Sequence, residues 1–302
     1  MPTVENRGSV HKFLEGYSIE VTAQQSRRID RFDDLLALGT RVYIPHTPHT
    51  DLRDITALAV RIRTEQMVPV PHVVARRIGT LAVADDFLAR LVGEADVAQV
   101  LVVAGDVARP AGGLRGAQEV LESGLLEKHR IRTIGVAGYP EGHPTLSDDV
   151  LRDALDRKRA YAEQTGATVY IVTQFAFSAD PVIAWERSIA TANDALSVIV
   201  GLPGLATART LLKYAVDCGV GASVQAFAKR YGSLTKLLLE STPGESLAAL
   251  ARHREQTPDS RLAGVHFYTF GSFARTVRWA NDVLAGKLEV VEEGAVVPVA
   301  GG

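Results

Sequence analysis

The sequence predicts a (β/α)8 barrel, because eight short apolar runs alternate with longer helical patterns along nearly the whole chain. Polar residues follow several different runs, and in a barrel the carboxyl ends of all strands meet at one mouth. An open doubly wound sheet usually has a Gly-rich phosphate turn after its first strand, whereas here Thr22-Ala23-Gln24-Gln25 follows. The expected strands are Tyr17–Val21, Arg41–Pro45, Val68–His72, Gln99–Val103, Thr133–Ala137, Thr168–Val172, Ser197–Gly201 and Gly264–Phe267.

Each expected strand is followed by a segment whose apolar residues recur at three- and four-residue spacing, which is typical of an amphipathic helix. The connection after the seventh strand is longer than one helix requires, and Gly219 and Gly221 interrupt its pattern. We expect three helices there, at Leu205–Asp217, Ser223–Tyr231 and Thr235–Arg254. Residues 1–16 are expected to form an N-terminal extension and residues 285–302 a short tail with a frayed end, so that residues 1–302 make a single domain.

The composition is that of an ordinary globular enzyme, with 46% hydrophobic and 23% charged residues. A net charge of −2 and the lack of a basic run interleaved with aromatics argue against nucleic acid as a partner. Cys218 is the only cysteine, so no disulfide can form within the chain and a reducing compartment is expected. No apolar run approaches the length of a membrane span, and we expect a cytoplasmic protein. Whether it forms a homo-oligomer is left open.

Glu20 ends the first expected strand, where the period-two alternation places its side chain inside the barrel near the mouth. A partly desolvated carboxyl group has a raised pKa and can donate a proton near neutral pH. A salt bridge at the rim is the structural alternative for Glu20, and the sequence alone does not decide between the two.

Two further strand ends carry polar groups suited to a flat heteroaromatic ligand. Gly105 would let the backbone approach such a ligand, and the carboxylate of Asp106 could accept hydrogen bonds from it, although a helix N-cap is an equally ordinary role for this aspartate. The amide of Gln174 offers both a donor and an acceptor to a pterin edge, and Phe175 or Phe177 could stack on a ring, unless these two belong to the core.

Histidines and cations in two other segments indicate contacts with a nucleotide rather than a metal. His46 and His49 lie in a Pro-rich loop without the helical spacing of a metal motif, so we expect no metal and assign His46 to a phosphate or adenine, with Asp51 as the N-cap of the next helix. The adjacent Arg157 and Lys158 could hold a pyrophosphate, although a charge run on a helix is more often a solvated face.

Several motifs, taken together, resemble the methylenetetrahydrofolate reductase family. Gly138-Tyr139-Pro140-Glu141-Gly142-His143-Pro144 matches a signature of that family almost letter for letter. Other segments that resemble family motifs follow in the family's order at the ends of expected strands, over about residues 17 to 270. They are Ser18-Ile19-Glu20, Val70-Pro71-His72-Val73, Gly105-Asp106, Thr173-Gln174-Phe175, Gly201-Leu202-Pro203-Gly204 and His266-Phe267-Tyr268-Thr269.

The resemblance implies a barrel that passes a hydride from NADH or NADPH to FAD and then to 5,10-methylenetetrahydrofolate, with ping-pong kinetics. Glu20 would protonate the folate, and Asp106 would lie between flavin and pterin. Gln174 would bind the pterin, and Phe175, Phe177 and Tyr268 would line the folate site. The resemblance implies an FAD site formed by His72, Gly105, Tyr139, His143, Arg157 and Lys158, with Asp106 beside the flavin, and the residue pattern adds His46 to the cofactor contacts.

The sequence also departs from the family pattern at contacts to flavin and folate. The family's Glu-Phe-Phe-Pro-Pro becomes Glu20-Val21-Thr22-Ala23-Gln24, its Thr-Tyr-Gly becomes Ile44-Pro45-His46, and the arginine before Gly-Asp becomes Ala104. A family tyrosine and a further family arginine correspond to Ala117 and Ser272. These departures leave three alternatives open: a divergent member with looser FAD binding, direct hydride transfer without flavin, and a related one-carbon carrier or the oxidising direction, after a demethylation, as the physiological reaction. A non-catalytic barrel that binds folate or a nucleotide is a further alternative of a different class.

Overall fold

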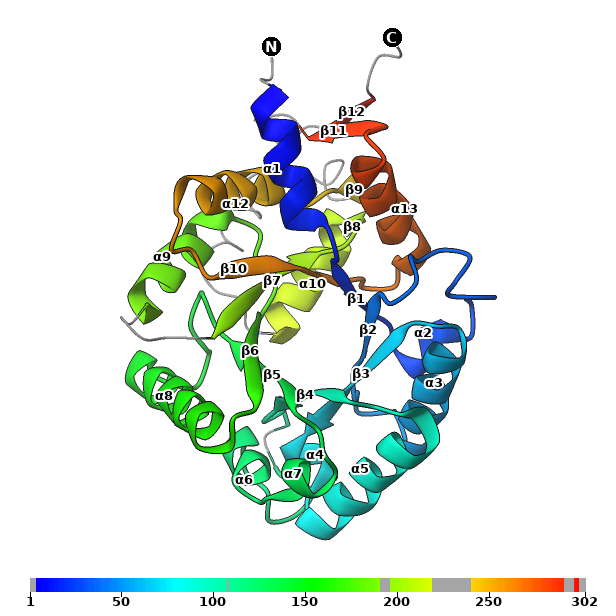
Figure 1. The fold of residues 1–302 in the computed structure, drawn as a ribbon, viewed down its shortest axis with the longest axis vertical. Coiled ribbons are helices and arrows are strands. Elements are labelled where there is room, and N and C mark those ends of the chain that lie inside the picture. Colours follow the sequence, from blue (N-terminus) through cyan, green and yellow to red (C-terminus); the bar gives the residue numbers. More distant parts are fainter. Residues whose placement is uncertain (1–3, 108, 191–195, 219–239, 291–295, 299–302) are drawn as a thin grey trace. The chain divides into compact units, whose positions relative to one another are not determined.

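Eight parallel strands form the central sheet, which closes into a barrel in the order β1-β10-β7-β6-β5-β4-β3-β2 (Figure 1). The structure is a computed structural model that describes residues 4–107, 109–190, 196–218, 240–290 and 296–298. All eight predicted strands are present, each within two residues of its expected ends. The barrel strands are β1 (Ser18–Glu20), β2 (Arg41–Ile44), β3 (Val68–Val74), β4 (Gln99–Val103), β5 (Thr133–Gly138), β6 (Thr168–Thr173), β7 (Ser197–Pro203) and β10 (Leu262–Tyr268).

The contacts of the chain divide it into two compact units, which are described in turn. The first unit comprises Met1–Tyr17, Gly138–Leu151 and Val172–Gly302, and the second unit comprises Ser18–Ala137 and Arg152–Ile171. Among the described residues, no helix combines the length and the hydropathy that crossing a membrane requires.

In the second unit, the strands from β1 to β5 pair in parallel, with Glu20 opposite Tyr43 and Ile44 opposite Pro71. Helices cover the outer side of these strands (Figure 1). They are α2 (Ala23–Ser26), α3 (Leu52–Thr64), α4 (Ala75–Ile78), α5 (Leu81–Ala95), α6 (Ala117–Leu121), α7 (Leu125–Lys128) and, in part, α8 (Asp148–Thr165). As predicted, α3 begins at an Asp51 N-cap, whose side chain accepts a hydrogen bond from the N–H of Arg53 (3.0 Å).

The interior of this part of the sheet contains a short chain of polar side chains. Gln99 Nε2 donates to the Tyr170 hydroxyl (2.6 Å), which in turn lies 2.8 Å from the Tyr43 hydroxyl. A Cβ atom at Gly135 would lie 2.8 Å from the Tyr170 hydroxyl, so the absence of a side chain at Gly135 makes room for this tyrosine. The polar groups satisfy one another, as buried hydroxyls require.

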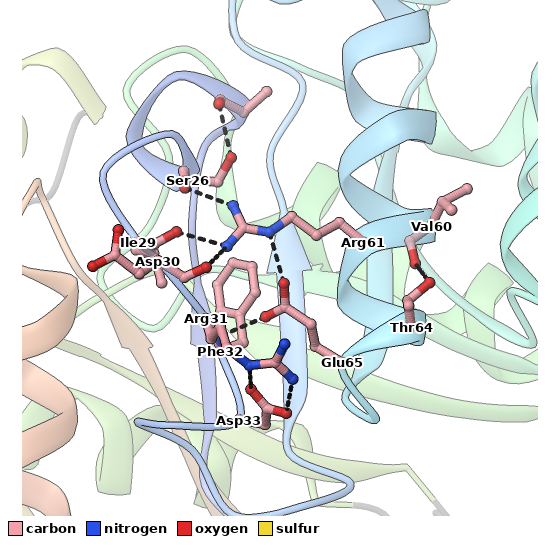
Figure 2. Close-up of polar contacts among 11 residues, drawn as sticks. Ser26, Ile29, Asp30, Arg31, Phe32, Asp33, Val60, Arg61, Thr64 and Glu65 are labelled. Atoms are coloured by element: carbon pink, nitrogen blue, oxygen red, sulfur yellow. Dashed lines mark hydrogen bonds and ion pairs between the residues drawn. The ribbon is translucent and has the colours of Figure 1, made fainter.

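The segment after β1 differs from the prediction, because it contains only the four-residue helix α2 in place of a full amphipathic helix. Thr22 caps α2, and Gln25 completes a capping box with it. The remainder is a loop fixed by α3 (Figure 2): the Arg61 guanidinium donates to the carbonyls of Ser26 (2.9 Å), Ile29 (2.6 Å) and Asp30 (2.8 Å). These tertiary hydrogen bonds replace those that a longer helix would make within itself.

Glu65 completes this loop clamp, which we define as Arg61, Glu65 and the loop of residues 26–33 that they hold. One Glu65 oxygen accepts from Arg61 Nε (2.8 Å), and the other accepts from the backbone N–H of Phe32 (Figure 2). The Arg61 guanidinium also lies 5.0 Å from the centroid of the buried Phe32 ring. The clamp therefore fixes the loop of residues 26–33, which follows β1, the strand that ends in Glu20.

In the first unit, β7 and β10 pair in parallel, with His266 opposite Gly201 and Tyr268 opposite Pro203. The expected N-terminal extension contains a helix that buries Phe13 and Leu14. Glu186 joins its own helix to a second helix and to the start of β10, because one of its oxygens contacts His253 Nε2 (2.8 Å) and the other accepts from the N–H of Arg261 (2.6 Å), the residue before β10. The helices of this unit are α1 (Val4–Leu14), α9 (Ala179–Ile189), α10 (Ala208–Cys218), α12 (Gly244–Gln256) and α13 (Phe273–Leu284).

The connection between β7 and β10 corrects one further expectation, and the C-terminal tail contains an element that was not predicted. Residues 240 and 241 form strand β9 (Glu240–Ser241), paired with β8 (Ala206–Thr207), and the helix expected from Thr235 begins only at Gly244, after Pro243. The tail contains an antiparallel pair, β11 (Leu288–Val290) and β12 (Val296–Pro298). The helix predicted at Ser223–Tyr231, together with Gly219 and Gly221, lies outside the described residues, as do positions 299–302 of the predicted frayed end.

Candidate functional site

Most predicted site residues lie at or shortly after the carboxyl ends of strands, and two lie on helix α8; each group is described within its own unit. The second unit contains Glu20, His46, His72, Gly105, Asp106, Arg157 and Lys158. The first unit contains Tyr139, His143, Gln174, Phe175, Phe177 and Tyr268.

Glu20 is the last residue of β1, and its side chain is partly buried. Burial raises the pKa of this carboxyl group from 4.5 to about 8, because the low-dielectric surroundings disfavour the charged form. At neutral pH the group therefore carries its proton and can act as a general acid. The sequence analysis predicted a carboxyl group at the end of this strand and a raised pKa for it.

His46 and His72 lie at the ends of the neighbouring strands β2 and β3. The pairing of Ile44 with Pro71 places His72 level with Pro45, one residue before His46. Burial lowers the pKa of His46 to about 4 and that of His72 to about 3, and each value is lowered further by a nearby basic group, Arg77 for His46 and His46 for His72. Both imidazoles are therefore neutral at physiological pH.

Gly105 adopts a left-handed backbone (φ +95°), and a Cβ atom there would lie 2.5 Å from Val74 Cγ1. The glycine thus serves close packing against the end of β3. The neighbouring Asp106 points outward, with 76% of its side chain exposed, and accepts a hydrogen bond from Arg77 Nη2 (2.5 Å). Arg77, only 10% exposed, is a neighbour of these predicted residues that we did not predict, although the Arg76-Arg77 pair shortly after β3 is a signal for it.

The two adjacent cations of α8 do not act together. Arg157 is exposed and forms an ion pair with Asp153 one helical turn earlier (3.0 Å). Lys158 is buried and donates to the Ala137 carbonyl oxygen at 3.0 Å, and burial lowers its pKa to about 8. Arg157 thus lies on a solvated face, whereas Lys158 joins α8 to the end of β5.

In the first unit, the loop that follows β5 forms a turn in which Gly142 has φ +80° and donates its N–H to the Tyr139 carbonyl (3.1 Å). The Tyr139 and His143 rings are in edge-to-face contact, with centroids 5.1 Å apart. His143 Nδ1 accepts a hydrogen bond from the N–H of Thr145 (3.2 Å), so the ring proton of the neutral form is on Nε2. The structure therefore brings these two predicted residues together.

Gln174 follows β6 directly, and its backbone N–H donates to the Gly138 carbonyl at the end of β5 (2.9 Å). The Tyr268 hydroxyl donates to the Thr173 carbonyl (2.9 Å) and fixes the end of β10 near that of β6. A Cβ atom at Gly201 would overlap both the Thr173 oxygen (2.4 Å) and the Tyr268 ring (2.6 Å). The glycine at this position is therefore required for the close approach of these strand ends.

An aromatic cluster surrounds these strand ends, and it joins the predicted Phe175, Phe177 and Tyr268 to two residues that we did not predict. Phe175 is buried at its base and contacts the rings of Phe177 (5.6 Å), Tyr268 (5.7 Å) and Phe270 (4.9 Å). Tyr214 of α10 stacks on Phe270 at 4.5 Å. Phe270 has φ +47°, an unusual backbone for a bulky residue, and no local pattern marked it or Tyr214 as part of this cluster.

Comparison with solved structures finds two similar chains, and the first of them has the same fold. An uncharacterized protein from Clostridium thermocellum, solved with two copies of 5-methyl-5,6,7,8-tetrahydrofolic acid bound, is 12% identical with a TM-score of 0.57, over 92% of this chain and 99% of its own. A putative phosphonomutase from Burkholderia cenocepacia J2315 is 13% identical with a TM-score of 0.48, over 93% of this chain and 98% of its own.

A sequence model of the methylenetetrahydrofolate reductase family matches residues 69–271. The matched segment covers most of the chain and includes the strand ends from β3 to β10. The chain therefore belongs to the methylenetetrahydrofolate reductase family.

Proposed function

We propose that this protein reduces 5,10-methylenetetrahydrofolate to 5-methyltetrahydrofolate with a hydride supplied by NADH or NADPH. The observation that carries the proposal is the Glu20 carboxyl group, which burial keeps protonated at neutral pH at the end of a barrel strand. The family of the chain supports the choice of reaction.

In the proposed mechanism, Glu20 donates its proton to a nitrogen of the five-membered imidazolidine ring of the folate. The C–N bond to the methylene carbon then breaks, and the remaining nitrogen forms an iminium with that carbon. Hydride addition to the iminium carbon gives the methyl group. The amide of Gln174 is proposed to bind the pterin, and the rings of Phe175, Phe177 and Tyr268 are proposed to pack against the aromatic parts of the folate.

The family resemblance implies FAD as the carrier of the hydride, and the described residues fit FAD in part. Bound FAD would accept a hydride from the nicotinamide and deliver it to the folate. In the second unit, His46 Nδ1 and His72 Nε2 are buried nitrogens without a hydrogen-bond partner among the described residues, which suits the polar groups of a flavin. The Tyr139 and His143 pair is proposed to contact the adenine or phosphate part.

One observation favours a second candidate, in which NAD(P)H transfers its hydride directly to the folate. The cations expected to hold the FAD pyrophosphate are engaged elsewhere, Arg157 with Asp153 and Lys158 with the Ala137 carbonyl. Glu20 has the same role as acid in this alternative, because the iminium forms in the same way.

One experiment separates these candidates from each other and from a non-catalytic folate-binding barrel. The visible spectrum of the purified protein is recorded, and NADH and NADPH oxidation is measured with and without methylenetetrahydrofolate. Flavin absorbance that NAD(P)H bleaches in the absence of folate supports the FAD route; a colourless but active protein supports direct transfer; a colourless and inert protein supports the binding barrel. Running the assay from 5-methyltetrahydrofolate with an oxidant tests the reverse direction.

The role of Glu20 is tested by Glu20→Gln in the same assay. Glutamine keeps the shape of the side chain but has no acidic proton to donate, so we expect the rate of folate reduction to fall at least about 100-fold. With FAD bound, flavin reduction by NAD(P)H should stay close to the wild-type rate, because this half-reaction does not use the proton. An equal loss in both half-reactions would remove Glu20 from the acid role.

A further inference from the structure

Two tyrosines of the second unit meet inside the barrel. The hydroxyl oxygens of Tyr43 on β2 and Tyr170 on β6 lie 2.8 Å apart, and both side chains are buried. In the closed order of the eight strands, β2 and β6 are four places apart, so the two tyrosines come from opposite strands. We call this pair the tyrosine bridge. It differs from the usual filling of such barrels, in which branched aliphatic side chains dominate.

The tyrosine bridge lies at the level of Glu20. Strands β1 and β2 pair with Glu20 opposite Tyr43, and paired residues of neighbouring parallel strands point to the same face of the sheet. The Tyr43 side chain points into the barrel, because its hydroxyl group reaches the opposite strand. Glu20 therefore also points into the barrel, beside Tyr43.

The residues around the tyrosine bridge hold it and pack tightly against it. Gln99, the first residue of β4, donates from Nε2 to the Tyr170 hydroxyl (2.6 Å), so the bridge is held from the amino-terminal end of the strands. A Cβ atom at Gly135 would lie 2.8 Å from the Tyr170 hydroxyl oxygen and 2.9 Å from Leu101 Cδ1. The packing at Gly135 thus leaves no space even for a methyl group.

We infer that the tyrosine bridge closes the barrel on the amino-terminal side of Glu20 and keeps water from reaching the Glu20 carboxyl group from that side. Tyr43 and Tyr170 are then positioning residues, which act through Glu20 rather than on the substrate. The role of Glu20 as the acid rests on the proposed function, whereas the closure rests on the bridge alone. Closure accounts for the desolvation that raises the pKa of Glu20 to about 8.

The charged and titratable groups around the bridge do not replace this explanation. Burial is the cause of the raised pKa of Glu20. In the second unit, the His72 ring centroid lies 6.0 Å from that of Tyr43, and this imidazole is neutral because its own pKa is about 3. Arg41, at the start of β2, acts on Tyr170, whose pKa it lowers by less than burial raises it. The exclusion of water is therefore the property to test.

The test measures the pKa of Glu20 in the full-length protein without turnover. Infrared difference spectra between each protein and the same protein carrying Glu20→Gln isolate the band of the protonated Glu20 carboxyl group, and the loss of this band with rising pH gives the midpoint. The wild-type midpoint should lie at about 8. Tyr170→Leu leaves a gap lined by the polar groups of Gln99 and Tyr43, which draws in water, so its midpoint should fall by about one to two pH units.

Three further variants separate closure from other effects. Tyr170→Phe keeps the ring and removes only the hydroxyl oxygen, so its midpoint should stay within about half a pH unit of the wild type. Gly135→Ala displaces the bridge without changing a tyrosine and should lower the midpoint. Tyr161→Leu is the matched control, because this buried tyrosine of α8 donates to Glu127 (2.6 Å) outside the strands, and its midpoint should match the wild type. Circular dichroism confirms that each variant is folded.

The inference is overturned if Tyr170→Leu and Gly135→Ala both keep the wild-type midpoint, or if Tyr161→Leu lowers it equally. An equal fall in Tyr170→Phe also overturns it, because the hydroxyl group rather than the closure would then set the midpoint. If Tyr170→Leu does not fold, Gly135→Ala decides. Folate reduction is assayed separately: turnover with a midpoint that does not depend on the bridge rejects only the closure, and a bridge-dependent midpoint without turnover rejects only the reductase.

Discussion

At the scale of single residues, Glu20 links the fold to the chemistry through its protonation. The folded protein holds the carboxyl proton up to a pKa of about 8, whereas the unfolded chain releases it near 4.5. The proton therefore stabilises the folded state fully below pH 4.5, and this contribution is lost as the pH rises to about 8. Glutamine does not ionise, so the free energy of unfolding of Glu20→Gln should lack this decrease. Relative to the wild type, the variant should become more stable as the pH rises from 5 to 8, and the difference should level off at about 2–5 kcal/mol above pH 8.

Urea unfolding curves of both proteins at pH 5, 6, 7, 8 and 9 measure this difference. Glu15→Gln, at an exposed position just before β1, is the control and should show no such trend. A difference between Glu20→Gln and wild type that does not change with pH would mean that the Glu20 carboxyl group ionises normally in the folded protein. The same titration predicts that folate reduction declines as the pH rises through about 8, since the acid must be protonated to act.

Gly105 and Gly142 offer a second comparison between single residues. Both have positive φ values, +95° and +80°, but an added Cβ atom would overlap a neighbour only at Gly105, where Val74 Cγ1 would lie at 2.5 Å, whereas at Gly142 the nearest atom, Asp148 Oδ1, would lie at 3.9 Å. We expect Gly142→Ala to lower the free energy of unfolding by about 1 kcal/mol and Gly105→Ala by about 2–4 kcal/mol, because the second change adds a steric overlap to the backbone strain.

A double-mutant cycle with Val74→Ala isolates the overlap at Gly105. The substitution removes the clashing methyl group, so Gly105→Ala should be less damaging in its presence by about 1 kcal/mol or more, as measured by chemical denaturation. Additive effects would show that Gly105 is required for its backbone angle alone.

Single-residue predictions succeeded where the signal was local. Glu20 at a strand end and Asp51 at a helix start were both readable from a few neighbouring residues. Tyr214 and Phe270 were not, because they meet only after the chain has folded, with 4.5 Å between rings that lie far apart in sequence. The exposed Arg157 and the buried Lys158 also differ because of their partners, Asp153 and the Ala137 carbonyl, which the composition does not reveal.

At the scale of elements, the loop clamp explains why the segment after β1 is not a full helix. Arg61 contacts three backbone carbonyls and Glu65, so the loop's polar groups are satisfied from α3 rather than within the loop (Figure 2). Arg61→Met keeps the apolar stem but leaves these acceptors without their donor. We expect the free energy of unfolding to fall by about 2–4 kcal/mol in thermal or urea denaturation.

Arg53→Met, on the exposed face of the same helix, is the matched control and should change stability by less than about 0.5 kcal/mol. Limited proteolysis adds a local measurement, since loosening the clamp should expose cleavage sites within residues 26–33 before the rest of the chain unfolds. Similar stability and cleavage patterns in the two variants would show that the loop does not depend on Arg61.

Strands were predicted more accurately than the segments between them for a physical reason. The strands are short, β-branched and buried, so their sequences reflect their environment directly. The segment after β1 and the region from residue 240 instead depend on distant partners: α3 fixes the first, and β8 pairs with β9 in the second. Pro243 was a local signal for the later start of α12, since proline is favoured at helix starts and disfavoured inside helices.

At the scale of the whole molecule, the two units are interleaved along the chain. Three of their four boundaries fall inside β5, α8 and β6, and the fourth lies between Tyr17 and Ser18, directly before β1, so each unit contains segments that are distant in sequence. Independent domains are normally joined through exposed linkers that few contacts cross. The sequence predicts a single domain, and a single domain should unfold cooperatively. We therefore expect that neither unit unfolds without the other.

The two tryptophans make this claim testable, because Trp185 and Trp279 both belong to the first unit. Tryptophan fluorescence therefore reports only the first unit, whereas far-UV circular dichroism reports the helices of both. During urea unfolding the two signals should give coincident curves with the same midpoint and slope, since a shared strand or helix cannot remain folded in one unit after the other is lost. A circular dichroism phase without a fluorescence change would mean that the second unit unfolds separately.

Arg61→Met provides a sensitive form of the test, because the contacts it removes lie in the second unit. If the molecule unfolds cooperatively, the urea midpoint measured by fluorescence should shift by as much as the midpoint measured by circular dichroism.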